Sequence, residues 1–225
     1  MTFIKKKFDY ASIKRKSVEG RRLYECPDGN AVASVTTILD RTKDKTHLIE
    51  WRKRVGEAKA QEITTEAAGR GTRMHKFLEV YIETGIMPDA GTNPYSIQAR
   101  KMAEQIQAKA LVDLEEAWGQ EVNLFFPKIY AGTTDLVGVY KGNHCIMDYK
   151  QTNKPKKKEW VEDYYLQLVA YVEAHNEVHG TDIREGHIFM CSQDFQYQQF
   201  DLWPDEYDHW KNEWWKRVEQ YYLSN

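Results

Sequence analysis

The chain has 225 residues, of which 41% are hydrophobic, 29% charged and 13% aromatic. This length suits one compact domain, here predicted to span residues 1–225, and the 7 Trp, 14 Tyr and 8 Phe residues argue against a disordered chain. The mean hydropathy of -0.73 and the absence of a long apolar run exclude the class of membrane-spanning proteins. We therefore expect a soluble, intracellular, cytoplasmic protein that has no membrane partner.

The formal net charge of -2 excludes a protein that binds nucleic acid through its whole surface, so any such site must be local. Two segments are basic. Residues 1–25 hold eight Lys or Arg against three acids, and a second cluster consists of Lys154, Lys156, Lys157 and Lys158. The first segment is either an arm that binds a polyanion or a disordered tail, and the second is either a phosphate-binding loop or a solvated surface.

The first half of the chain is predicted to hold a hairpin and helices. Residues 21–26 and 31–35 flank Pro27-Asp28-Gly29-Asn30, and Asp-Gly is typical of a tight turn. Apolar spacing from residue 46 to about 81 is helical, and Gly56, Gly69 and Gly71 are expected to divide this stretch into two helices. Residues 86–93 read as a loop and residues 94–118 again as helix. We thus expect a basic arm and hairpin over residues 1–45 and a helical region over residues 46–118.

The second half is predicted to form a sheet. Residues 121–126, 131–140 and 143–149 are rich in β-branched and aromatic side chains, as are residues 183–190 and 196–203. A lysine-rich loop over residues 151–159 precedes a helix over residues 160–179. A final helix sets Trp210, Trp214, Val218 and Tyr221 on one stripe, which favours packing. The predicted fold class is α/β, with a sheet core over residues 119–203 as a mixed central sheet flanked by helices, and a C-terminal helix over residues 204–225.

The chemically informative residues are Asp135, Asp148 and Lys150. Asp148 and Lys150 share one face of a strand because side chains alternate. If Tyr140 and Asn143 flank a two-residue turn, Asp135 lies opposite Asp148, roughly 5 Å away. If the turn is Gly142-Asn143 instead, Asp135 faces Lys150. Both registers gather the three groups on one patch.

Two facing carboxylates repel each other and need a compensating charge. A hard divalent cation such as Mg²⁺ or Mn²⁺ supplies it, activates bound water and neutralises charge on a phosphate under attack. Lys150 would then position or deprotonate the attacking water. The alternative is a surface ladder in which lysine offsets the acids without any metal.

Two helical pairs accompany this patch. His75 and Glu79 lie one turn apart, as do Gln167 and Tyr171. His75 either completes a metal shell or is a packing residue. Tyr171 and Gln167 either line a site or belong to the core and the surface.

The three cysteines are widely spaced and include no CxxC pair, which argues against a disulfide framework and against a four-cysteine zinc or iron–sulfur site.

Taken in order, these motifs resemble the PD-(D/E)xK nuclease superfamily in its RecB-like branch. They are Gly71-x-x-x-His75-x-x-x-Glu79, Glu121, Gly132-x-x-Asp135, Asp148-Tyr149-Lys150 and Gln167-x-x-x-Tyr171. The segments Ser34-Val35-Thr36-Thr37-Ile38-Leu39 and Gly69-Arg70-Gly71-Thr72 are similar to those of mitochondrial genome maintenance exonuclease and phage-encoded relatives. If this protein is encoded by a virus, we expect it to act in the host cytoplasm.

The resemblance implies a restriction-endonuclease-like core and a role for each motif residue. Asp135, Asp148, the Tyr149 carbonyl and His75 would hold the metal, Lys150 would be the catalytic lysine, and Glu79 and Glu121 would lie behind the metal ligands. Substrate contacts are expected from Gln167, Tyr171, Arg70, Arg73, Ser34, Thr36, Lys154 and Lys156.

The function implied is a Mg²⁺- or Mn²⁺-dependent deoxyribonuclease, an exonuclease that prefers single-stranded DNA with free ends and works without an iron–sulfur cluster. The alternatives are a structure-specific endonuclease on the same fold and a noncatalytic DNA-binding protein. A monomer is favoured over an oligomer. If a free DNA end is threaded into the site, a helical arch must cover the site, and residues 41–118 are the segment that could form this arch.

Overall fold

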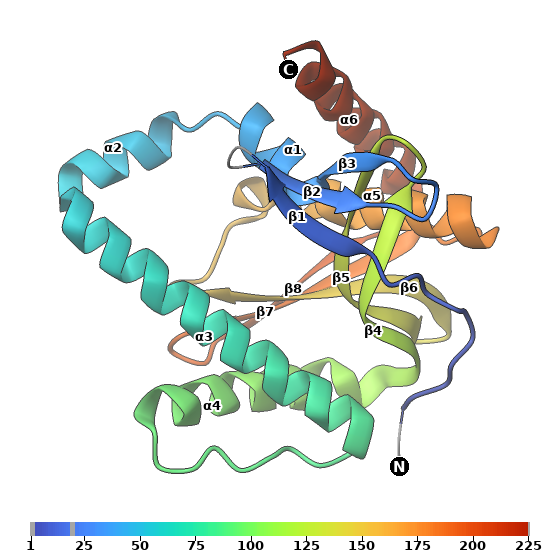
Figure 1. Cartoon of the computed structure of the whole chain (residues 1–225). Helices are drawn as coiled ribbons and strands as arrows, with labels where there is room; N and C mark the ends of the chain where they lie inside the picture. Colours follow the sequence, from blue (N-terminus) through green and yellow to red (C-terminus); the bar gives the residue numbers. More distant parts are fainter. Residues whose placement is uncertain (1–2, 19–20, 225) are drawn as a thin grey trace.

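The computed structural model describes residues 3–18 and 21–224. Residues 1–2 and 19–20 of the predicted basic arm and Asn225 of the predicted last helix lie outside the described residues. The predicted fold class is confirmed, because a mixed eight-stranded sheet carries helices on both faces (Figure 1).

All eight strands formed by residues 3–18 and 21–224 belong to one sheet. They are β1 (Lys14–Val18), β2 (Arg21–Glu25), β3 (Ala31–Ser34), β4 (Leu114–Phe126), β5 (Tyr130–Tyr140), β6 (Asn143–Thr152), β7 (Glu185–Ser192) and β8 (Tyr197–Leu202). The order is β1-β2-β3-β5-β6-β7-β8, with β4 on the remaining edge of β5. The β3–β5 and β6–β7 pairs are parallel and the others antiparallel. The predicted hairpin is therefore part of the sheet, which extends beyond the predicted core of residues 119–203.

The two edges of β5 are paired differently, and this difference creates the candidate site. β4 accompanies β5 along its whole length. On the opposite edge, β3 pairs with Tyr130 and Ala131 at the start of β5, whereas β6 pairs with Leu136–Tyr140 at its end. Residues 132–135 fall between these two ladders. The sheet therefore opens next to Asp135.

The described residues form six α-helices: α1 (Val35–Thr42), α2 (Thr46–Val55), α3 (Glu57–Thr84), α4 (Pro94–Lys109), α5 (Glu162–His179) and α6 (Pro204–Leu223). Helices α1, α5 and α6 share one buried cluster with β5, and α3 and α4 share a second one with the opposite sheet face. The predicted aromatic stripe of α6 packs inward: Trp214 is fully buried, and Trp210 stacks on Tyr165 with ring centroids 4.8 Å apart.

Two helix predictions are wrong in their boundaries. The break in the first stretch falls at Gly56 alone, and α3 runs through Gly69 and Gly71 without interruption. A helical glycine costs only about 1 kcal/mol relative to alanine, which packing offsets. A Cβ on Gly71 would lie 3.1 Å from Cγ of Gln151, so glycine lets α3 approach β6 closely.

The predicted helix over residues 94–118 ends at Lys109, and β4 begins at Leu114. Bulges between residues 114 and 119 disturb the alternation that identifies a strand. The backbone approaches so closely there that a Cβ on Gly138 would lie 1.9 Å from the Glu116 carbonyl oxygen.

Helix α2 and the start of α3 form a curve that stands away from the sheet (Figure 1), whereas the second half of α3, from Met74 to Ile82, packs on the sheet. Helix α2 buries none of its residues, which agrees with a protruding element. We refer to α2 together with the N-terminal half of α3 as the arch.

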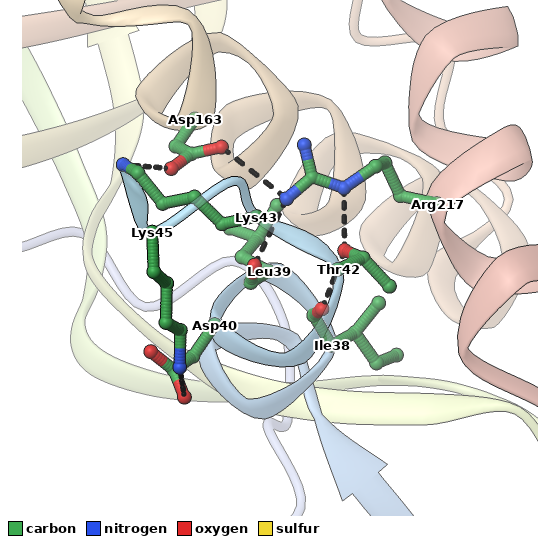
Figure 2. A network of polar contacts seen from close by, with 8 residues as sticks. All are labelled: Ile38, Leu39, Asp40, Thr42, Lys43, Lys45, Asp163 and Arg217. Atoms are coloured by element: carbon green, nitrogen blue, oxygen red, sulfur yellow. Dashed lines mark hydrogen bonds and ion pairs between the residues drawn. The ribbon is translucent and has the colours of Figure 1, made fainter. Parts of the chain in front are cut away.

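A polar network fixes the root of the arch. Figure 2 shows Arg217 of α6 reaching the last turn of α1, where its Nη2 donates to the Leu39 carbonyl at 2.9 Å and its Nε to the Thr42 hydroxyl. Arg217 and Lys43 both contact Asp163 of α5, at 3.5 and 2.5 Å. Lys43 begins the link to α2, so three helices hold the point where the arch departs.

Candidate active site

The β5–β6 hairpin brings Asp135 and Asp148 together. Its ladder pairs Tyr140 with Asn143 and Leu136 with Met147, which is the first of the two predicted registers and sets Asp135 beside Asp148. Asp135 Oδ2 accepts a hydrogen bond from the Tyr149 amide at 2.6 Å. Both carboxylates are buried.

Lys150 projects on the same side as Asp148, as strand alternation predicts. Its ammonium donates to Asp148 Oδ2 and lies 5.3 Å from the ring centroid of Tyr164 on α5. Burial alone would lower the pKa of Lys150, but the charges of Asp148 and Asp135 outweigh this effect and raise it. Lys150 therefore stays a cation over the physiological pH range.

His75 reaches this patch from α3. Its Nε2 lies 2.9 Å from the Tyr149 carbonyl oxygen and its Nδ1 lies 3.3 Å from Asp135 Oδ1. Both neighbours are acceptors, so the arrangement favours the doubly protonated ring. Burial lowers the pKa of His75, but Asp135 and Asp148 overcome burial and raise it to about 9.

Glu121 lies closer to the centre of the site than expected. The β4–β5 ladder pairs Gln120 with Leu136 and Val122 with Thr134, which sets Glu121 beside Asp135. One ligand atom from each of His75, Glu121 and Asp135 falls within 4.8 Å of the others. Glu121 also has φ of 49°, a left-handed conformation that non-glycine residues rarely adopt.

The acids of the site are crowded enough to shift one another. Burial, with the charges of Asp135 and Glu79, raises the pKa of Glu121 to about 7. Burial and Asp135 also raise the pKa of Asp148, while His75 holds that of Asp135 below its usual value against the effect of burial. Crowded carboxylates next to a backbone carbonyl are the hard oxygen donors that Mg²⁺ and Mn²⁺ prefer, so these residues fit such an ion.

Arg70 does not point into this cluster. Its buried guanidinium donates to the side-chain oxygens of Gln151 at 3.0 Å, Gln193 at 3.2 Å and Asn153. These bonds join α3 to the end of β6 and the β7–β8 turn. The structure thus gives Arg70 a positioning contact, and its predicted phosphate contact stays a prediction.

Arg73, the second predicted arginine, and the motif residues Ser34 and Thr36 lie in three different surroundings. Arg73 is exposed and lies 5.8 Å from the ring of Tyr95. Ser34 is buried and caps α1, since its Oγ accepts from the Thr37 amide at 2.9 Å. Thr36 lines an open groove beside α1. Substrate contacts by Arg73, Ser34 and Thr36 stay predictions.

Gln167 and Tyr171 form a pair behind the site. Gln167 Nε2 donates to the Tyr171 hydroxyl at 3.3 Å, and both side chains are buried. A Cβ on Gly132 would lie 2.8 Å from the Tyr171 ring, so this glycine lets α5 pack directly behind Asp135. Both side chains lie buried behind Asp135, and their predicted substrate contacts stay predictions.

Three more predicted residues lie at the rim. The Glu79 carboxylate pairs with Lys76 at 2.6 Å, and the charge of Glu79 reaches Glu121. Lys154 and Lys156 line a groove that also includes Gln151. Tyr164 belongs to none of the sequence motifs and was not predicted as a site residue, because no pattern distinguishes it from the other aromatic residues of α5.

The chain is 29% identical to human mitochondrial genome maintenance exonuclease 1 over 156 residues, which are 65% of this chain and 44% of that protein. The mouse protein of the same name is 29% identical over 157 residues, 65% of this chain and 45% of that protein. The predicted resemblance is confirmed. The chain spans about half the length of these curated relatives.

The fold has a solved counterpart. A candidate exonuclease from Eubacterium rectale superposes with a TM-score of 0.50 over 69% of this chain and 64% of that one, at 15% sequence identity. No protein-family model matches the chain. Among the described residues, no helix combines the length and the apolar character needed to cross a bilayer.

Proposed function

We propose that this protein is a metal-dependent DNA exonuclease that acts on single-stranded DNA with free ends. The observation that carries the proposal is the convergence of Asp135, Asp148 and Lys150 on one patch beside the Tyr149 carbonyl. The likeness to proteins named exonuclease supports the same reaction.

Asp135, Asp148 and the Tyr149 carbonyl would hold Mg²⁺ or Mn²⁺, with His75 and Glu121 at its border. When bound, such an ion lowers the pKa of a water ligand and neutralises charge that develops on the phosphate. Such an ion would compete with the proton on Glu121 and, at the Tyr149 carbonyl oxygen, with the His75 ring.

Lys150 would either orient the attacking water and offset negative charge on the phosphate as a cation, or help to deprotonate that water. Its contact with Asp148 fixes the ammonium at the edge of the cluster. Gln167 and Tyr171 support the strand from behind, and Arg70 fixes the distance between α3 and β6.

Two features of the surface support DNA as the substrate. A groove of about 910 Å³ beside α1 is lined by Arg15, Lys16, Arg41 and Lys45 and by one acid, Asp40, which pairs with Lys45, so its net charge is positive and suits a phosphate backbone. The arch stands away from the sheet (Figure 1), and its residues Trp51 and Ile63 line a groove together with Gln151, directly after Lys150, an arrangement that suits a strand supplied from its end.

The test compares linear, end-labelled single-stranded DNA with closed circular single-stranded DNA in Mg²⁺. We expect degradation of the linear strand only, abolished by chelator and reduced at least about 100-fold by Lys150→Ala. Lys158→Ala, whose ammonium pairs with Glu206 instead, serves as the matched control and retains activity.

Cleavage of the circular strand would replace the exonuclease proposal with the endonuclease alternative. DNA binding that is indifferent to chelator, without any product, would favour the noncatalytic protein.

A further inference from the structure

A second groove begins beside Lys150 and runs under the arch. Its volume is about 550 Å³, and its lining includes Trp51 of α2, Trp160, Tyr164, Lys154 and Lys156. Tyr164 also contacts Lys150, so the groove and the candidate active site share a wall. We call it the aromatic groove.

The aromatic residues of this groove are presented to solvent. Trp160 is 61% exposed, and Trp51 is partly exposed on a helix that buries none of its residues. The ammonium of Lys157 lies 5.5 Å from the Trp160 ring. Large exposed aromatic faces in a groove are typical of binding surfaces rather than of packing.

The charged residues that line the aromatic groove are all positive. No Asp or Glu is among its lining residues, and in the described part of the chain neither Lys154 nor Lys156 forms an ion pair. Burial, together with the nearby charge of Lys43, lowers the pKa of Lys156. A polyanion would relieve this repulsion between lysines.

The loop that carries the lysines is held in place. The Thr152 hydroxyl donates to the Lys154 carbonyl at 2.8 Å, and Gln198 of β8 accepts from the Lys156 amide at 2.7 Å and donates to its carbonyl at 2.8 Å. A fixed loop loses little conformational entropy when it binds a ligand.

We propose that the aromatic groove binds one strand of DNA, with bases stacked on Trp51 and Trp160 and phosphates against Lys154 and Lys156. The inference rests on the proposed function and adds that the aromatic groove contacts both the bases and the phosphates of the DNA strand. Only a single strand exposes the faces of its bases, so the groove selects unpaired DNA without reading its sequence.

The test measures binding with the catalytically silenced Lys150→Ala protein in Mg²⁺, by fluorescence anisotropy. The probes are an oligothymidylate and an abasic oligonucleotide of the same length, which carries the phosphates without bases. We expect the parent protein to prefer oligothymidylate, and Trp160→Ala and Trp51→Ala each to reduce that preference roughly 5- to 100-fold. Trp160→Phe restores part of it.

Trp203→Ala is the matched control, because Trp203 is 44% exposed at the start of α6 and lines no part of the aromatic groove. Retention of the full preference in both Trp160→Ala and Trp51→Ala, or an equal loss in Trp203→Ala, overturns the inference. If the preference behaves as expected while the wild-type protein degrades no DNA, the groove assignment holds and the proposed function fails.

Discussion

Glu121 carries the most unusual set of properties among the individual residues. It has a left-handed backbone conformation, lies beside Asp135 and has a pKa raised to about 7 by burial and neighbouring acids. A backbone conformation of this kind persists only where the surrounding structure enforces it, and such positions concentrate at functional sites. We infer that β4 places this carboxylate where it could border a bound ion.

The pKa of Glu121 makes metal binding depend on pH. Because the ion competes with the proton on Glu121, the affinity for Mg²⁺ should rise roughly tenfold between about pH 6 and pH 7.5. Glu121→Gln should flatten this rise, measured by isothermal titration calorimetry, whereas Glu83→Gln on the exposed side of α3 should leave it intact. A rise that is unchanged in Glu121→Gln would remove Glu121 from the metal site.

Among the individual residues, Asp135, Asp148 and Lys150 could be predicted from the sequence to share one patch, because a two-residue turn and strand alternation determine which side chains meet. Glu121 was assigned to the surroundings of the site instead. Its position depends on the register across residues 127–129, which does not follow from residue type.

Among the elements, the arch depends on contacts far from it in sequence. Arg217 of α6 binds the last turn of α1 and Asp163 of α5, and this network stands where the chain leaves for α2 (Figure 2).

Arg217→Ala should lower the free energy of unfolding by about 1–3 kcal/mol, since it leaves the Leu39 carbonyl and Asp163 without this donor. Chemical denaturation measures the change. Lys216→Ala, which removes only an exposed pair with Glu213, should change stability by less than about 1 kcal/mol. Equal effects of the two substitutions would contradict the role of the network.

The element boundaries illustrate what local patterns determine. Strands β5, β6 and β7 and helices α5 and α6 agree with their predictions to within a few residues, because their composition and periodicity act together. The interruption expected at Gly69 and Gly71 was wrong, because α3 continues through both glycines, and at Gly71 the missing side chain allows close packing against Gln151 of β6. β1 was not predicted at all, since its polar residues are held by pairing with β2.

In the molecule as a whole, Phe8 and Tyr10 of the N-terminal segment pack against the C-terminal part of α5. Phe8 packs on His175 with ring centroids 5.0 Å apart, and the Tyr10 hydroxyl lies 3.1 Å from His175 Nε2. Nδ1 of His175 lies 2.8 Å from the Thr181 hydroxyl, which itself donates to Asn176. The ring is therefore held neutral, and burial lowers its pKa to about 3.

This buried imidazole predicts acid sensitivity. Below about pH 6.5 the unfolded chain takes up a proton on His175 and the folded protein does not, so stability falls as pH decreases towards 3. Between about pH 6.5 and 5 the wild-type protein should lose roughly 2 kcal/mol more than His175→Gln, measured by denaturant titration. Replacement of the exposed His209 by Gln should leave the slope unchanged, and parallel slopes for wild type and His175→Gln would contradict the assignment.

The proposed function requires that Asp135, Asp148 and the Tyr149 carbonyl together hold one divalent ion. Anomalous diffraction from a Mn²⁺-soaked crystal would locate this ion. We expect an anomalous peak in contact with Asp135 and Asp148 in the wild-type protein and its loss in Asp135→Asn. A peak only elsewhere in the molecule, or one that persists undiminished in Asp135→Asn, would contradict it.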